Sequence, residues 1–195
     1  MFFHRLNDHH SLRQLTRNDA GEMFALVDAN RAYLRRWLPW LDRTQSAEDS
    51  RRFLEEVVQQ AESNRNIHAG ILVDGRIAGI VSYHRIDWQN CSTCLGYWLA
   101  EAHQGRGLVT ASCRVLVDHA FAAMNLHRLV IACVPGNTRS RAVALRLGFV
   151  HEGLQRDAEW LYDHFVDHDI YVQLQPEWEK QAIQRLAEIG QPGRV

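Results

Sequence analysis

Lysine, cysteine and long apolar runs are all scarce in this 195-residue sequence. Lys180 is the only lysine among 22 basic residues, and the formal net charge is −1. That balance lacks the basic surplus of proteins that bind nucleic acids or anionic membrane surfaces. No apolar run approaches the roughly 18–20 residues of a membrane-spanning helix. The N-terminus MFFHRLNDHH also lacks the basic start and long apolar stretch of a secretory signal. We therefore expect a cytoplasmic protein without a nucleic-acid or membrane partner.

Only four cysteines are present: Cys91, Cys94, Cys113 and Cys133. The first two have C-x-x-C spacing, but no second pair completes a zinc site. His164 and His168 share one face of an expected strand without a clearly converging ligand set. We therefore expect reduced, packed thiols and no metal site.

Hydrophobic periodicity and turn residues divide the chain into alternating segments. Strands are expected at residues 11–16, 67–73, 76–86, 94–100, 127–134, 149–161 and 164–174. Helices are predicted over residues 17–38, 46–64, 108–124 and 138–147. This order predicts an α/β (α+β) protein with a mixed sheet of about seven strands and helices on both faces. One domain would cover residues 1–175, and the tail 176–195 either adds a helix or frays.

A glycine-containing loop, EAHQGRGLVT, separates the strand that ends near residue 100 from the helix that begins near residue 108. Helix starts carry unpaired N–H groups and a positive dipole end, so they attract anions, phosphates above all. Gly105 and Gly107 have no side chain, which lets an anion approach their amides. Arg106 adds a cation and Thr110 a hydroxyl group. The loop therefore fits a pyrophosphate, although a tight turn alone would also explain the two glycines.

Two familiar phosphate-binding motifs are excluded. The sequence has no G-x-x-x-x-G-K-[ST], so it has no P-loop. The dinucleotide fingerprint G-x-G-x-x-G also fails, because Thr110 and Ala111 follow where its third glycine is required.

The run Gln104-Gly105-Arg106-Gly107-Leu108-Val109 resembles the Q/R-x-x-G-x-G/A motif of the GNAT acetyltransferases, except that Val109 replaces the last Gly or Ala. In that family the loop amides hold the pyrophosphate of acetyl-coenzyme A (acetyl-CoA). The resemblance covers roughly residues 10–174 and favours the RimJ/RimL branch. It is strongest to RimL-type ribosomal-protein-serine N-acetyltransferases, through NRAYLRRWLPWL and AEWLYDHFVDHDIY.

This resemblance implies the GNAT fold, with a mostly antiparallel central sheet, acetyl-CoA as the cofactor and a homodimer. It also implies a set of cofactor-binding residues: Tyr97, Trp98, Leu99, Gln104, Gly105, Arg106, Gly107, Leu108, Val109, Thr110, Asn137 and Ser140.

Acetyl transfer to an amine requires a neutral nitrogen and a stabilised oxyanion. A chain-terminal α-amine, with a pKa of about 7.7–8.0, loses its proton far more easily than lysine, with about 10.4. The candidate bases are Glu159, Glu152, Asp157 and His151. We favour Glu159, because RimL-like proteins have a proposed glutamate base at the matching place. An ordinary solvated carboxylate is the alternative.

The leaving thiolate needs a proton. The resemblance places Asn137 on the pantetheine arm and Ser140 near the thioester sulfur, as the proton donor. Ser140 could equally cap the helix that follows it. Cys133, at the end of a strand beside the cofactor, offers covalent catalysis as a less favoured route than direct attack.

Residues 31–43, RAYLRRWLPWLDR, form the expected acceptor wall, with Arg36, Trp37 and Trp40 as its substrate-binding residues. A helix end packed on the core or a dimer contact would also explain them. The favoured function is acetyl-CoA-dependent acetylation of a protein's N-terminal α-amine, on a ribosomal protein for example. The alternatives are acetylation of a small amine (an antibiotic, a polyamine or an aminoacyl compound) and a non-catalytic sensor of coenzyme A.

Overall fold

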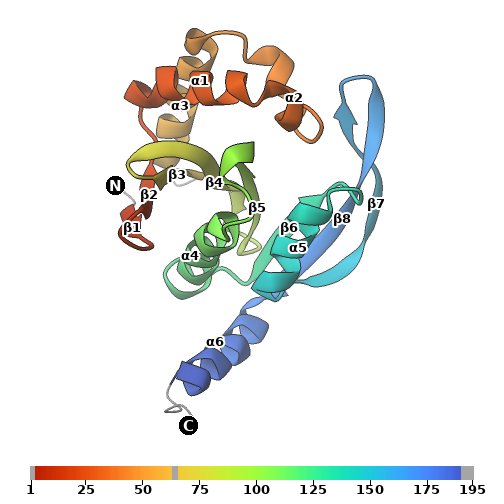
Figure 1. Cartoon of the computed structure of the whole chain (residues 1–195). Coiled ribbons are helices and arrows are strands. Elements are labelled where there is room, and N and C mark those ends of the chain that lie inside the picture. Colours follow the sequence, from red (N-terminus) through yellow and green to blue (C-terminus); the bar gives the residue numbers. More distant parts are fainter. Residues whose placement is uncertain (1–2, 63–65, 190–195) are drawn as a thin grey trace.

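The computed structural model describes residues 3–62 and 66–189, which form a mixed α/β fold around one eight-stranded sheet (Figure 1). The strands lie in the order β1-β2-β3-β4-β5-β6-β8-β7. Their bounds are β1 Phe3–Arg5, β2 His10–Gln14, β3 Ile67–Val73, β4 Arg76–Asp87, β5 Ser92–Leu99, β6 Arg128–Cys133, β7 Val150–Leu161 and β8 His164–Leu174. The sequence predicted about seven strands. The additional strand is β1, whose three residues are all exposed and therefore show no burial pattern.

The sheet is antiparallel except at one junction. β5 and β6 run parallel, and their pairing covers only Ser92–Arg128 to Cys94–Val130. Beyond those residues the two strands part, while β5 stays paired with β4 and β6 with β8. The sheet therefore opens in its middle.

Among the described residues, six helices and three short 3-10 turns surround the sheet. The helices are α1 Ala20–Ala29, α2 Arg31–Leu34, α3 Ala47–Glu62, α4 Leu108–Ala122, α5 Thr138–Leu147 and α6 Gln175–Ile189; the turns are η1 Arg17–Asp19, η2 Leu41–Arg43 and η3 Glu101–His103. None of the helices among the described residues is both long and apolar enough to cross a membrane.

The helices cover both faces of the sheet, as predicted. Strand side chains alternate between faces. On β4 and β5, Ile80 and Trp98 pack in a cluster with α1 and α3. Val81 and Leu99 point the other way, into the larger cluster that α4 and α5 complete. Figure 1 shows α1–α3 at the top of the view, above β3 and β4, while α4 lies below these strands, α5 lies over β6 and β8, and α6 lies at the bottom. We call these the α1–α3 face and the α4–α6 face.

The single helix predicted over residues 17–38 is wrong, because the chain breaks at Asn30. Its side chain turns back, with Nδ2 donating to the Leu26 carbonyl at 2.8 Å. Its Oδ1 accepts a hydrogen bond from the Glu101 amide at 2.9 Å. This second contact ties the N-terminal helices to the segment that follows β5. The two residues are 71 positions apart, so the local pattern of hydrophobic residues could not predict their contact.

The C-terminal helix α6 packs on α4. Trp178 lies 5.5 Å from Phe121 between ring centroids, and its Nε1 donates to Asp118 at 2.6 Å. Gln181 donates to the Gly148 carbonyl at 3.2 Å, beyond the end of α5. The last residues of the predicted tail, 190–195, lie outside the described residues.

Gly79 is the glycine at which sheet packing leaves no room for a side chain. A Cβ there would lie 2.2 Å from the Trp98 carbonyl oxygen and 2.9 Å from the Leu99 Cα, both backbone atoms. We expect Gly79→Ala to lower the free energy of unfolding by about 1–3 kcal/mol, measured by urea denaturation.

The matched control is Gly21→Ala in α1, where an added Cβ meets nothing within 4 Å. This change should stabilise the protein by roughly 0.5–1 kcal/mol, because alanine is the better helix former. Equal effects of the two substitutions would contradict the packing assigned to Gly79.

Candidate active site

The parting of β5 from β6 leaves backbone groups of β5 without a strand partner. The Ala100 amide donates to the Ala78 carbonyl at 2.8 Å, so residue 100 points its polar groups toward β4. Alternate residues of a strand point these groups to opposite edges. Tyr97 and Leu99 therefore direct their N–H and C=O groups into the opening. An extended ligand inserted there would find the hydrogen-bonding edge of a strand.

The glycine loop lies between η3 and α4, and both glycines adopt left-handed backbone angles, with φ of 75° at Gly105 and 73° at Gly107. At the N-terminus of α4, the first main-chain hydrogen bond of the helix runs from the Ala111 amide to the Gly107 carbonyl at 3.0 Å. The amides of residues 108–110 precede it and have no acceptor within the helix. A Cβ built on either glycine meets nothing within 4 Å, so an anion has open space beside these amides.

Two arginines of α5 face the glycine loop. Arg139 donates to the side-chain oxygen of Gln104, and Arg146 Nε donates to the Thr110 hydroxyl at 3.3 Å. Arg106 is exposed within the loop. The cationic side chains and the helix N-terminus together suit a pyrophosphate.

Ser140 lies across from β5, on the first turn of α5. The cap of that helix is Asn137, whose Oδ1 accepts from the Ser140 amide at 3.1 Å. The Ser140 hydroxyl is thus not the cap. It lies 3.0 Å from the Tyr97 hydroxyl and close enough to the Cys133 thiol to lower the pKa of that thiol. One hydroxyl cluster therefore joins β5, β6 and α5 beside the opening.

Burial fixes the protonation of this cluster. It raises the pKa of Tyr97 well above its ordinary value, so the phenol keeps its proton. It also raises the pKa of the Cys133 thiol, an effect that Ser140 opposes only in part. A thiol with a raised pKa is a poor nucleophile at neutral pH. The cluster is therefore better suited to donating hydrogen bonds than to forming a covalent intermediate.

Glu159 follows a bulge in β7 that separates two paired stretches of the β7–β8 hairpin. It pairs with Val166, and its carboxylate lies 3.5 Å from Nε2 of His168, with 33% of the side chain exposed. Both residues point to the α1–α3 face, opposite to Tyr171 and α5. Glu159 therefore keeps a polar neighbour and access to solvent.

The other candidate bases have different surroundings. Glu152 forms two hydrogen bonds with Arg128, which hold the pKa of that carboxyl below its usual range. His151 contacts Asp169 at 3.1 Å on the opposite face. Asp157 is exposed in the bulge, with φ of 48°.

The expected acceptor wall meets the tip of the β7–β8 hairpin. The Tyr162 hydroxyl donates to the Leu38 carbonyl at 2.5 Å. Arg35 covers the Tyr162 ring, with Cζ 3.8 Å from its centroid, and also binds Asp42 through two hydrogen bonds. Figure 1 shows the hairpin rising beside α2. We call the contact between Tyr162, Arg35 and Leu38 the clasp.

The three predicted substrate-binding residues lie within or next to this wall. Trp40 packs on Trp98 of β5, with ring centroids 6.2 Å apart. Trp37 is partly buried, and the exposed Arg36 guanidinium lies 5.5 Å from its ring. Trp40 thus links the wall to the strand that borders the opening.

Sequence reasoning missed His84 of β4, whose imidazole lies against Gly96 of β5. It also missed the contact between the hydroxyl groups of Tyr97 and Ser140. Strand alternation shows that residues 82 and 84 share a face, but only the register of β4 on β5 places one of them beside the opening.

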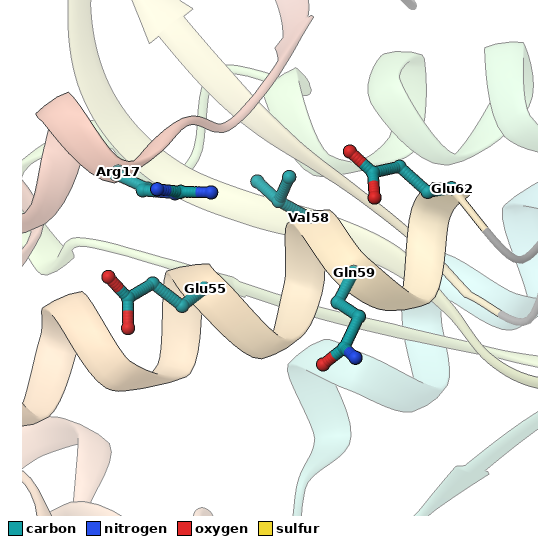
Figure 2. A pocket seen from close by; sticks show the side chains of 5 residues that line it. All are labelled: Arg17, Glu55, Val58, Gln59 and Glu62. Carbon is teal, nitrogen blue, oxygen red and sulfur yellow. The ribbon is translucent and has the colours of Figure 1, made fainter.

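The cysteines and a surface hollow on α3 add no further functional group to this site. The four cysteines are free thiols, and no group of three His, Cys, Asp or Glu side chains able to hold a metal ion occurs in the described residues. A surface hollow on α3 is lined by Arg17, Glu55, Val58, Gln59 and Glu62 (Figure 2). It contains none of the predicted site residues.

Comparison with known proteins agrees with this geometry. Residues 10–150 match the family model of the acetyltransferase (GNAT) domain. The chain is similar to the ribosomal-protein-serine acetyltransferase of Escherichia coli (strain K12), at 31% identity over 163 residues, which cover 84% of this chain and 91% of that protein.

Two solved structures are also similar. One is RimL, a ribosomal alpha-N-protein acetyltransferase in complex with coenzyme A, with a TM-score of 0.85 and 27% identity over 89% of this chain and 98% of that one. The other is the microcin self-immunity acetyltransferase MccE in complex with acetyl-CoA and AMP, with a TM-score of 0.83 and 30% identity over 87% and 94%. The chain therefore belongs to the GNAT acetyltransferase family, in its RimJ/RimL branch, and is an acetyl-CoA-dependent N-acetyltransferase.

Proposed function

We propose that this enzyme acetylates the N-terminal α-amine of a protein such as a ribosomal protein, in the cytoplasm, by direct attack of the amine on acetyl-CoA. The observation that carries the proposal is the opening between β5 and β6, with proton-handling groups on both of its sides. Similarity to RimL and to the ribosomal-protein-serine acetyltransferase supports the choice of acceptor.

The cofactor would lie along the opening. Its pyrophosphate would bind the amides and cations of residues 104–110, and its pantetheine arm would pair with β5 at residues 97–99 and with Asn137. This placement brings the thioester to the Ser140 hydroxyl. What supports it is the open space beside Gly105 and Gly107 and the unpaired edge of β5.

The chemistry then needs three contributions. Glu159 takes a proton from the acceptor's ammonium group, a step that costs only about 1 kcal/mol at pH 7 for an α-amine. The nitrogen lone pair forms the C–N bond, while a β5 amide stabilises the oxyanion. As the C–S bond breaks, the nitrogen loses its second proton, which reaches the thiolate through Ser140. Glu159 later returns its proton to water.

A small amine is the second candidate acceptor. The similarity to MccE, which was solved with acetyl-CoA and AMP, favours this alternative. Incubation with acetyl-CoA and a panel of Ser-initiated and Ala-initiated peptides and small amines would separate the two, with mass spectrometry of the products. Acetylation of small amines alone would contradict the favoured acceptor.

We further propose a homodimer that uses the free edge of β7. Its support is a set of exposed apolar side chains on the β7–β8 hairpin: Val150, Leu154, Trp160 and Phe165. Sedimentation velocity should give a mass near twice the 22.5 kDa of one chain, and Leu154→Glu should shift it toward the monomer. A monomeric wild-type protein would refute this assembly.

If Glu159 is the base, Glu159→Gln should lower turnover by about 10²-fold, the usual contribution of a general base. The affinity for acetyl-CoA should stay unchanged, because the carboxylate does not contact the cofactor in this mechanism. Glu152→Gln, on the same strand, is the matched control and should retain turnover. Weakened cofactor binding with intact turnover would exclude Glu159 as the base.

If the loop holds the pyrophosphate, Gly107→Leu should raise the KM for acetyl-CoA about tenfold, equivalent to ~1.4 kcal/mol. The new side chain would occupy the space beside the α4 amides. Gly75→Leu is the matched control, since Gly75 has a similar φ of 78° and open surroundings in the β3–β4 turn. It should reproduce the backbone strain without the kinetic effect. Unchanged cofactor kinetics in the Gly107 variant would place the pyrophosphate elsewhere.

A further inference from the structure

We propose that His84 binds the acceptor: its Nε2 accepts a hydrogen bond from the incoming amine and orients the nitrogen toward the acetyl group. This inference rests on the proposed function and deepens it, because it gives the acceptor nitrogen a contact on the β4 side of the opening. Nothing in the chemistry above assigns a role to this residue.

The first support is the position of the imidazole. A Cβ built on Gly96 would lie 1.8 Å from Nε2 of His84, so the ring lies directly over the Gly96 α-carbon. Gly96 is the second residue of β5 beyond its last pairing with β6. The next amide along the strand, that of Tyr97, points into the opening. His84 therefore stands beside the point where the acetyl carbonyl would be held.

The second support is the face on which the ring lies. His84 shares the α1–α3 face with Trp98 and Glu159. Glu159 belongs to β7, on the part of the sheet beyond the opening, whereas His84 belongs to β4, on the near part. An amine that enters from the α1–α3 face would contact the Glu159 carboxylate on one side and the His84 imidazole on the other.

The third support is how the ring is held. Ser82 Oγ lies 3.3 Å from Nε2 and 3.3 Å from the Gly96 carbonyl oxygen. The ring meets His68 of β3 edge-on, with centroids 5.8 Å apart, and His68 meets Phe53 of α3 in the same way. Despite these contacts, His84 keeps an exposed surface. The imidazole is thus held by Ser82 and His68 and still has a surface that an acceptor can reach.

The surroundings also keep the imidazole neutral. Packing of protein atoms around it lowers the pKa of His84 below 6.5. The titratable groups that face it are His68 from β3 and Cys94 from β5, and both are uncharged near pH 7. Burial lowers the pKa of His68 to about 4 and raises that of the Cys94 thiol. A neutral imidazole has one nitrogen lone pair that can accept a hydrogen bond. When Ser82 donates to the Gly96 carbonyl, Nε2 is free to accept from the amine.

His84 gains no proton in this arrangement. The ammonium group has three N–H bonds: one proton passes to Glu159, and one N–H donates to Nε2 while the lone pair forms the C–N bond. As the C–S bond breaks, one N–H proton reaches the thiolate through Ser140, and the last N–H remains on the amide product. His84 thus orients the nitrogen, and Glu159 removes its charge.

The test compares His84→Leu with His84→Gln, using acetyl-CoA and a Ser-initiated peptide, or spermidine if the peptide is not acetylated. His84→Leu should lower kcat/KM for the acceptor about tenfold, with the KM for acetyl-CoA unchanged. His84→Gln should recover most of this loss, because its side-chain oxygen can accept the same hydrogen bond. In the wild type, kcat/KM for the acceptor should also fall below pH 6.5, as the imidazole gains a proton and loses its lone pair. His84→Gln should lack that part of the pH profile.

His4→Gln is the matched control, since this exposed histidine belongs to β1, at the far edge of the sheet. It should leave both readouts unchanged. The inference is overturned if His84→Leu, folded as judged by its thermal melting, keeps the wild-type kcat/KM for the acceptor. It is equally overturned if His84→Gln keeps the wild-type acid limb. Failure to acetylate the peptide would count only against the proposed acceptor, because spermidine still reports on His84.

Discussion

The early end of the pairing between β5 and β6 is the constraint on which the site depends. Three residue pairs hold these strands together, and each strand then follows its other neighbour. A continuous sheet would satisfy all backbone groups internally and leave no strand edge for a ligand. The opening instead directs the amides of Tyr97 and Leu99 toward a space that is flanked by α4 and α5. In the mechanism that we propose, catalysis depends on backbone groups that the sheet leaves unpaired.

Several titratable groups on the strands that border the opening are uncharged. Burial holds Tyr97, Cys133 and Cys94 in their uncharged forms. Charged side chains stand farther out, with arginines beside the glycine loop and Glu159 on the hairpin. A thioester carbonyl in such surroundings meets hydrogen-bond donors whose strength water does not screen. The arrangement suits a reaction in which charge develops briefly on oxygen and sulfur.

Local signals in the sequence predicted much of this architecture. Helix α5 occupies the predicted residues 138–147, with Gly148 at its C-terminal end in the left-handed conformation, and the Asp74-Gly75 turn joins β3 to β4. The glycine loop lies where its motif predicts, between a strand and a helix. Each of these features depends on residues close together in the chain. That proximity is why sequence patterns reveal them.

The features that escaped prediction depend on distant partners. The break at Asn30 requires the Glu101 amide, and the place of His84 depends on the register of β4 on β5. Helix capping was an equal alternative for Ser140, but the structure gives that role to Asn137 and turns the Ser140 hydroxyl toward Tyr97. The roles assigned to Glu159 and Ser140 stay predictions. Contacts of this kind arise from the three-dimensional arrangement of strands, which periodicity does not encode.

The clasp has a consequence for how the enzyme assembles. The strands, glycine loop and helix start that border the opening come from one contiguous stretch, residues 92–140, whereas the Tyr162–Leu38 contact spans 124 positions in the chain. Closing so long a loop is entropically costly and favours late formation during folding. Strand β6, however, pairs along its whole length with β8, so the far border of the opening also needs the final hairpin. We expect the cofactor cleft and the entrance for the acceptor to be completed together, once that hairpin has been synthesised.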